Sequence, residues 1–182
     1  MPLSLDDIAS LFMQHGHIQY SGEPVTQLEH ALQTALRAEQ AGADNELVTA
    51  ALLHDLGHLL VHHGDSPTLQ GIDDLHQFVA IPFLRGVFSD GVLSTIQLHV
   101  DAKRYLCATR PGYQQALSAD SQRSLQLQGG VFSTKEAQAF AQHPQAKHAV
   151  ALRLWDDLAK QPALPTPPLS HYLARARRCQ LA

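Results

Sequence analysis

Residues 50–60 read AALLHDLGHLL. Eight of these eleven residues are Ala, Leu or Gly, a composition typical of a buried helix. His54, Asp55 and His58 interrupt it. A buried carboxylate without a partner costs several kcal/mol or takes up a proton. The stretch therefore predicts that something compensates Asp55, and a metal ion is the first candidate.

Further histidines and one aspartate occur in similar apolar surroundings. His30, His76 and His99 each fall within a different expected helix, and Asp156 lies in RLWDDLAK. Metal sites in the core of helical bundles are built from side chains on different helices. Four imidazoles and two carboxylates would suit a pair of ions with one bridging carboxylate. The alternative is a set of unrelated, hydrogen-bonded core histidines.

Composition narrows the class of protein. The chain has 182 residues and a formal net charge of −4, which gives no reason to expect nucleic acid or a membrane as partner. Cys107 and Cys179 are its two cysteines, a usage that fits a reducing compartment. The N-terminus lacks the pattern of a signal peptide, and no apolar run could span a membrane. We expect a cytoplasmic, monomeric protein.

Helical signals dominate, so we expect an all-α fold. One domain is expected over residues 1–160, with 161–182 as its proline-rich C-terminal tail. Two short helices are expected around SADSQRSLQLQ, and the basic tail RARR (175–178) is expected to be a solvated terminus. The longer expected helices cover about 4–14, 24–40, 46–62, 73–84, 91–106, 134–142 and 144–160. We expect Gly64 to close the third, Pro82 to kink or end the fourth, and a capping box of Ser133 and Glu136 to open the sixth.

The order of the polar residues resembles the dinuclear branch of the HD-domain superfamily. That resemblance implies a compact helical HD-domain bundle in which Asp55 bridges two metals. It assigns the first metal to His30, His54, Asp55 and Asp156. It assigns the second to Asp55, His76 and His99.

Longer blocks are similar to those of the phosphonate-degrading HD oxygenases, a group related to myo-inositol oxygenase. They span roughly residues 20–160: YSGEPVTQLEHALQ (20–33), GIDDLH (71–76), LHVDAKRYLCA (98–108), SLQLQGG (124–130) and RLWDDLAK (153–160). The resemblance implies two iron ions, mixed-valent Fe(II)/Fe(III), with O2 as co-substrate. It also implies a small organophosphonate substrate, 2-amino-1-hydroxyethylphosphonate, whose C–P bond is cleaved to give glycine and phosphate.

Several side chains could bind such a substrate. Lys103 follows His99 by four residues and so shares its helix face, with Arg104 adjacent. His58 lies one turn beyond His54. Lys103 and His58 could form a charge-assisted cradle for the phosphonate, with Ser121 or Gln128 as further partners. For Lys103 and Arg104 the alternative is a solvated helix end.

Tyr20 and Glu23 precede the helix that carries His30. The resemblance implies that they form a gate, in which the tyrosine occupies the iron when substrate is absent and the glutamate binds the substrate ammonium. Gln27 could orient Glu23. Tyr20, His58 and Lys103 are the expected catalytic residues. Without the resemblance, a tyrosine in a loop is more often a packing residue.

Three other functions remain open at this point. The same ions could generate hydroxide in an HD-type phosphohydrolase. A silent HD module could bind a signalling ligand. An oxygenase could also act on the N-trimethylated 1-hydroxyphosphonate to form glycine betaine, and that cation would favour an aromatic surround such as Tyr105 or Tyr113.

Overall fold

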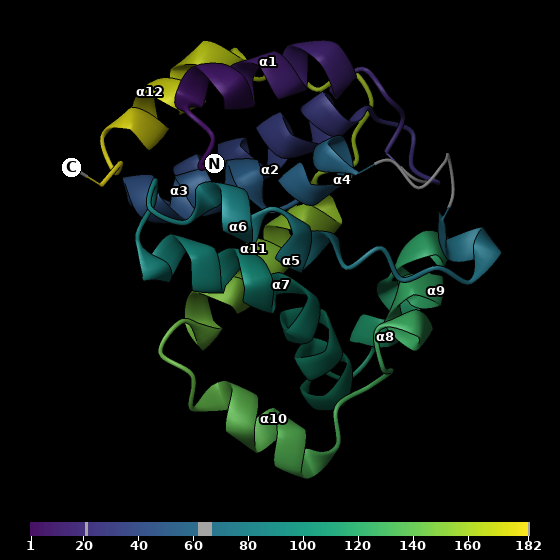
Figure 1. The fold of residues 1–182 in the computed structure, drawn as a ribbon. Coiled ribbons are helices and arrows are strands. Elements are labelled where there is room, and N and C mark those ends of the chain that lie inside the picture. The colour runs from purple at the N-terminus through teal and green to yellow at the C-terminus, as the bar shows by residue number, and fades with distance from the viewer. Residues whose placement is uncertain (21, 62–66, 182) are drawn as a thin grey trace.

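The computed structural model describes residues 1–20, 22–61 and 67–181. The described residues form helices and no strand, and their only β-type pairings are two isolated bridges, which confirms the all-α prediction. At the centre lie α2 (Gln27–Gln40), α3 (Asn45–Leu53), α7 (Asp90–Thr109) and α11 (Ala146–Leu158). The helix α7 packs along α11, α2 packs along α3, and α3 also contacts α7 (Figure 1).

Smaller elements surround this centre. Figure 1 shows α1 (Leu5–His15) and α12 (Leu169–Arg177) side by side across the top, and α10 (Thr134–Ala141) at the opposite end. The remaining short elements are α4 (Leu56–Leu60), η1 (Pro67–Gln70), α5 (His76–Val79), α6 (Ile81–Leu84), α8 (Tyr113–Ala116) and α9 (Ala119–Leu127). None of the helices in the described ranges is long and apolar enough to cross a membrane.

Local capping chemistry sets many helix starts. The Ser4 hydroxyl accepts a hydrogen bond from the Asp7 amide, and the Asp7 carboxylate accepts one from the Ser4 amide. Ser133 and Glu136 form the same reciprocal box at the start of α10, as the sequence predicted. Asp44 caps α3 through the amide of Leu47. These serine and aspartate signals were sufficient to place the starts of α1, α3 and α10.

The start of α2 was predicted too early. Pro24 was expected as its first helical residue, but the helix begins after a capping box between Thr26 and Glu29. The preceding residues form a turn instead, in which the Tyr20 amide donates to the carbonyl of Val25 at 2.9 Å. This turn brings Tyr20 towards the beginning of α2.

The continuous helix expected over 46–62 is also wrong. The chain leaves α-helical geometry at Asp55, where φ is −103° and ψ is 14°, so α3 and α4 are separate helices. His54 turns its ring back so that Nδ1 lies 2.9 Å from the Ala51 carbonyl. The break changes the direction of the chain between His54 and His58. The predicted last residue of this helix, at 62, and its expected stop at Gly64 lie outside the described residues.

The segment after η1 is helical over a shorter stretch than predicted. Neither Asp73 nor Asp74 opens a helix, because their carboxylates accept hydrogen bonds from the amides of Leu75 and His76 and α5 starts only at His76. The helix then stops at Val79, and Pro82 lies in the first turn of α6.

The C-terminal helix α12 packs against α1 and α3, with Tyr172 and Ala176 buried. Arg175 forms an ion pair with Glu39 and donates to the side-chain oxygen of Asn45 at 3.0 Å. The prediction that 175–178 is a solvated terminus is therefore wrong for Arg175, because α12 turns that side chain towards α2. Arg177 and Arg178 are exposed as expected.

Gly57 allows α4 to approach α5. A Cβ at Gly57 would lie 2.2 Å from the carbonyl oxygen of His76 and 2.8 Å from its carbonyl carbon. These are backbone atoms, so Gly57→Ala must displace α5 and His76 with it. We expect the free energy of unfolding to fall by about 1–3 kcal/mol, the usual range for overpacking. Denaturant unfolding measures this loss.

Gly91→Ala is the matched control for this substitution. A Cβ at Gly91 would meet no atom closer than 3.5 Å. Because Ala is the better helix former, this variant should be as stable as the parent or slightly more stable. Equal stability of the two variants would contradict the role assigned to Gly57.

Candidate metal centre

The histidines and aspartates predicted from the sequence converge at the centre of the bundle. One group contains His30 from α2, His54 after α3, and Asp156 from α11. The Nε2 atoms of His30 and His54 are 3.2 Å apart, and Asp156 Oδ1 lies 3.4 Å from His30 Nε2. All three residues are nearly inaccessible to solvent.

A second group lies on the other side of Asp55. It contains His76 from α5 and His99 from α7, whose Nε2 atoms are 3.1 Å apart. Asp55 connects the two groups. Its Oδ2 lies 3.5 Å from His30 Nε2 and 3.3 Å from His54 Nε2. Its Oδ1 lies 3.4 Å from His76 Nε2 and 3.6 Å from His99 Nε2. One carboxylate oxygen thus faces each pair of imidazoles.

The other ring nitrogens have fixed partners. The Nδ1 atoms of His30, His54 and His99 lie 2.9, 2.9 and 2.6 Å from the carbonyls of Ala159, Ala51 and Ile96, listed in that order. A carbonyl can only accept, so each Nδ1 carries a proton, and in the neutral ring Nε2 then presents a lone pair. His76 Nδ1 lies 2.7 Å from Asp74 Oδ1, which has the same effect. Second partners of this kind orient metal-binding imidazoles.

Lone pairs that face one another need a cation between them. Within the described part of the chain, the buried oxygens Asp55 Oδ2 and Asp156 Oδ1 have no hydrogen-bond donor. An unpaired buried carboxylate oxygen is costly, and a divalent ion would satisfy it together with the imidazoles. The donor set contains nitrogen and oxygen without thiolate, so it fits Fe, Mn, Zn or Co. The residues present therefore suit a pair of metal ions.

The electrostatics of the site also favour cations. Burial lowers the pKa of His30, but the carboxylates of Asp156 and Asp55 raise it more, to about 9. Burial and the neighbouring His54 and His76 hold the pKa of His99 well below its ordinary value. The carboxylates thus attract positive charge, while the crowding of imidazoles disfavours placing it on every ring as a proton.

A cavity opens above these residues. It is lined by Tyr20, Glu23, Gln27, His58, Lys103, Ser121 and Gln128, all of which the sequence singled out, and its floor includes Asp55, His76, His99 and Asp156. Tyr20 stacks on the ring of His30, with centroids 3.9 Å apart, and desolvation and the negative charge of Asp55 hold the pKa of its phenol well above 10. Tyr20 therefore covers the first group of candidate ligands.

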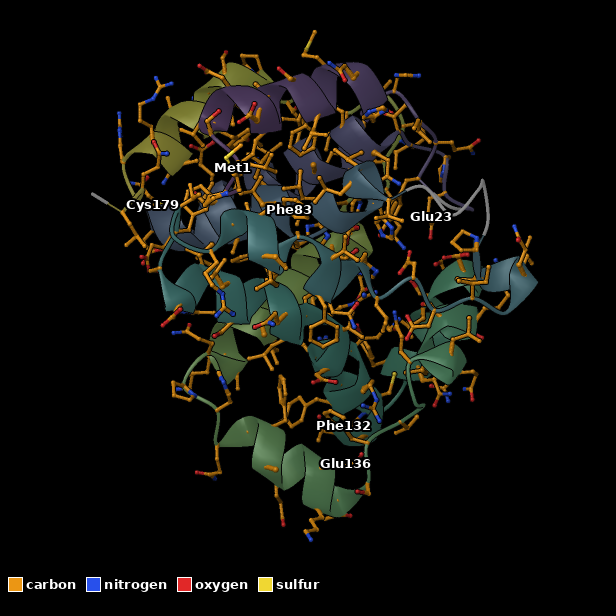
Figure 2. All side chains as sticks on the ribbon, viewed as in Figure 1. Met1, Glu23, Phe83, Phe132, Glu136 and Cys179 are labelled. Carbon is orange, nitrogen blue, oxygen red and sulfur yellow. The ribbon has the colours of Figure 1, made fainter. Side chains whose placement is uncertain are left out.

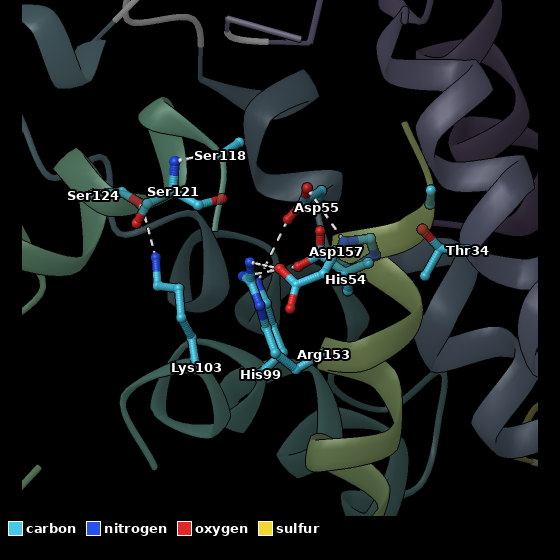
Figure 3. Close-up of polar contacts among 12 residues, drawn as sticks. Thr34, His54, Asp55, His99, Lys103, Ser118, Ser121, Ser124, Arg153 and Asp157 are labelled. Carbon is cyan, nitrogen blue, oxygen red and sulfur yellow. Dashed lines mark hydrogen bonds and ion pairs between the residues drawn. The ribbon is translucent and has the colours of Figure 1, made fainter. Parts of the chain in front are cut away.

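Lys103 is only 2% exposed, so it is not a solvated helix end. Its ammonium donates to the Ser124 hydroxyl at 2.7 Å (Figure 3). Burial and the nearby Arg153 guanidinium lower its pKa to about 7. No carboxylate lies within ion-pair distance of Lys103 among the described residues. The cavity thus contains a buried amine without an acidic partner, suited to an anionic ligand.

Arg104, which the sequence offered as a substrate-binding residue, lies outside the cavity. Its guanidinium donates to the carbonyls of Gly129 and Gly130 and lies over the ring of Phe132. Arg104 does not line the cavity. Figure 2 shows Phe132 near α10, away from Glu23. Adjacent helical residues point about 100° apart, so Lys103 and Arg104 cannot both face the site.

The tyrosines considered for a trimethylammonium pocket also lie elsewhere. Tyr105 packs against Phe140, and the Tyr113 hydroxyl contacts Asp157 and Arg153. Neither tyrosine lines the cavity. The aromatic surround suggested for that alternative is therefore not built from these two residues.

Sequence reasoning missed several charged residues of the site. Asp74 accepts from His76 and forms an ion pair with His58 Nδ1 at 2.9 Å. Arg153 pairs with Asp156 at 2.9 Å, and Lys160 pairs with Glu23 at 2.7 Å. All three lie inside the blocks GIDDLH and RLWDDLAK. Asp74 and Arg153 lie two and three residues from His76 and Asp156, so spacing was the available signal for these two contacts. The pairing of Lys160 with Glu23 depends on tertiary packing.

Fold and geometry define an all-α protein with a candidate dinuclear metal centre. Residues 28–160 match the HD domain family. A hydroxymethylphosphonate dioxygenase from Gimesia maris is 44% identical over 170 residues, covering 93% of this chain and 84% of that protein. A glycine-betaine-forming [1-hydroxy-2-(trimethylamino)ethyl]phosphonate dioxygenase from Leisingera caerulea is 37% identical over 171 residues, covering 94% and 87%. The chain belongs to the HD domain family and, within it, to the group of phosphonate dioxygenases.

Asp74→Asn tests the support of His76. Burial tends to raise the pKa of Asp74, but His58 and His76 lower it more, so it is ionised in the folded protein. An amide at this position removes the charge that orients His76. We expect metal affinity at the second group to fall by about 10–100-fold, measured by competition with a chelator.

Asp73→Asn is the control for this measurement. The Asp73 carboxylate accepts from the Leu75 amide, and no histidine contact is seen for it in the described ranges. This variant should retain the metal affinity of the parent. Equal affinities in all three proteins would show that Asp74 does not support the site.

Proposed function

We propose that this chain is a di-iron oxygenase that uses O2 to cleave the C–P bond of a small 1-hydroxyphosphonate. The observation that carries the proposal is the Asp55 carboxylate between two pairs of imidazoles, at the floor of a cavity that contains the buried Lys103. The identity and number of the metal ions are part of the proposal. The relatedness to phosphonate dioxygenases supports the oxygenase class.

The proposed reaction balances without a further reductant. One O2 and one 1-hydroxyphosphonate give one carboxylic acid and one phosphate. The C–P and C1–H bonds are broken, and C1 is oxidised to the carboxyl level while O2 supplies two oxygen atoms. Iron, when bound, would supply the activation of O2. His30, His54, Asp55 and Asp156 would hold one ion, and Asp55, His76 and His99 would hold the other.

The polar residues of the cavity would bind and orient the substrate. The Lys103 ammonium and the Ser121 and Ser124 hydroxyls line the same wall, and Ser124 already accepts from Lys103. Together they can accommodate the oxygens of a phosphonate through charge-assisted hydrogen bonds. His58, which forms an ion pair with Asp74, lines the same cavity from α4. Orientation of C1 towards the metals is the main contribution of these side chains.

Tyr20 would limit access of water to the metals. Its ring lies flat on His30 and edge-on to His58, at 6.3 Å between centroids. A substrate that reaches the first group must displace this phenol. The position of the Tyr20 ring therefore supports the proposed gating role. The raised pKa of its phenol keeps it neutral in the absence of metal.

The proposal leaves three hydroxyphosphonates as candidate substrates, and each would give a different carboxylic acid. 2-Amino-1-hydroxyethylphosphonate, expected from the sequence, would give glycine. Hydroxymethylphosphonate, the substrate in the name of the Gimesia relative, would give formate. The trimethylated compound, in the name of the Leisingera relative, would give glycine betaine.

The experiment reconstitutes the protein with iron under anaerobic conditions and then adds O2 with each of the three hydroxyphosphonates. At least one should give its carboxylate and phosphate in equal amounts, dependent on both iron and O2. Phosphate release from a phosphate monoester without O2 would instead support the phosphohydrolase. No turnover of any hydroxyphosphonate by the iron-loaded protein would contradict the proposal.

Anion binding should depend on pH through Lys103. Its pKa is about 7 in the free protein, so the amine is charged below pH 7 and loses its proton as the pH rises through 7. A bound dianion favours the charged form and raises that pKa. We expect the affinity for sulfate, which does not titrate here, to fall above pH 7 by up to about tenfold per unit. Calorimetry between pH 6 and 9 measures the decline.

Lys103→Arg is the comparison, because a guanidinium remains charged throughout this range. The affinity of the variant for sulfate should decline less steeply above pH 7. The decline that remains is assigned to loss of the proton from His58. An equally steep decline in the two proteins would show that Lys103 does not control anion affinity.

A further inference from the structure

We propose that Lys160 determines substrate specificity. By neutralising Glu23, it selects hydroxyphosphonates whose C1 substituent carries no positive charge, such as hydroxymethylphosphonate, over those with an amine. This inference rests on the proposed function and names the substrate class of the same cavity.

Lys160 reaches into the cavity from the end of α11. Its ammonium lies 2.7 Å from Glu23 Oε1, 3.3 Å from the Ser118 hydroxyl and 3.5 Å from the Ser121 hydroxyl. It also lies 5.8 Å from the centre of the Tyr20 ring. The ammonium therefore stands between Glu23 and the wall to which the phosphonate is assigned.

The backbone around Lys160 is fixed on both sides. The preceding carbonyl, of Ala159, accepts from His30, and the following residue, Gln161, exchanges hydrogen bonds with Gln33 at 2.8 and 3.1 Å. The position of Lys160 is thus tied to the same helix, α2, that carries a candidate metal ligand. The backbone that carries Lys160 is therefore held beside the cavity, and the ion pair with Glu23 holds its ammonium there.

Glu23 is fixed as well. Its amide donates to the Tyr20 carbonyl at 2.9 Å, and its carbonyl accepts from the Gln19 side chain at 3.0 Å. The side chain of Glu23 is 9% exposed and that of Lys160 is 13% exposed. Because water screens this pair weakly, the ion pair determines the charge of its side of the cavity.

A substrate amine would meet an unfavourable field here. Glu23 and Lys160 together carry no net charge, and an ammonium beside Glu23 would also lie beside a second ammonium. Such a like-charge contact is a common way in which binding sites reject a competing ligand. Among the other carboxylates of the lining, Asp74 pairs with His58 and His76, and Asp120 pairs with Arg123. Asp73 accepts from the Leu75 amide. A substituent without charge avoids this cost.

The test compares kcat/KM for hydroxymethylphosphonate and 2-amino-1-hydroxyethylphosphonate in the iron-loaded parent and in Lys160→Met. The parent should prefer the hydroxymethyl compound. Removing the ammonium frees Glu23, so the variant should shift the ratio towards the amine by about tenfold or more. The double variant Glu23→Gln/Lys160→Met should lose this shift, because it lacks the carboxylate that would bind the amine.

A binding measurement separates this inference from the proposed function. Anaerobic calorimetry with methylphosphonate and 2-aminoethylphosphonate, which lack the C1 hydroxyl, needs no turnover. Lys160→Met should bind the amino compound more tightly relative to methylphosphonate than the parent does. Absence of turnover in every protein would contradict the proposed function, while this binding ratio would still decide the role of Lys160.

Lys147→Met is the matched control, since Lys147 is an exposed lysine of α11. It should leave both ratios unchanged. Lys160→Gln, which removes the charge but keeps a polar end, provides a second variant if the methionine destabilises the fold. Unchanged ratios in a folded Lys160 variant, or a parent that prefers the amine in both assays, would overturn the inference.

Discussion

The arrangement of this protein depends on one buried carboxylate, that of Asp55. Each of its oxygens faces a pair of imidazole Nε2 atoms, at 3.3–3.6 Å. The Nδ1 atoms of these rings are directed to carbonyls or to Asp74, so their Nε2 atoms are crowded around the carboxylate. A pair of metal ions would satisfy these nitrogen and oxygen atoms together. The helices that carry the rings must then hold them together at close range.

Several structural details follow from that requirement. The chain turns between α3 and α4, which places Asp55 between the two groups instead of along one helix face. Gly57 lets α4 approach the backbone of His76. The cavity above the candidate metal centre has a floor of carboxylates and imidazoles, while Lys103 and the ion pair of Glu23 and Lys160 lie on its walls. The proposed preference for an anionic substrate with an uncharged substituent rests on this distribution.

The sequence predicted what depends on local pattern or spacing. The capping box of Ser133 and Glu136 and the all-α fold belong to this group, because short-range hydrogen bonds and helix periodicity determine them. The convergence of the candidate ligands was expected from their apolar surroundings on different helices and from the resemblance to the HD-domain superfamily. The break at Asp55 was missed, since the apolar run around it continues without interruption and only tertiary contacts impose the turn. Arg104 was expected at the site because it is adjacent to Lys103, but adjacent helical residues point about 100° apart. Lys160 was missed because its partner Glu23 lies 137 residues away.

The bridging position of Asp55 can be tested by the anomalous scattering of crystals of the iron-reconstituted protein, recorded at the iron absorption edge. We expect two iron peaks, one beside each oxygen of Asp55. His30, His54 and Asp156 should surround the first peak, and His76 and His99 the second. A single peak, or an ion held by His58 and Asp74 with no contact to Asp55, would contradict the account.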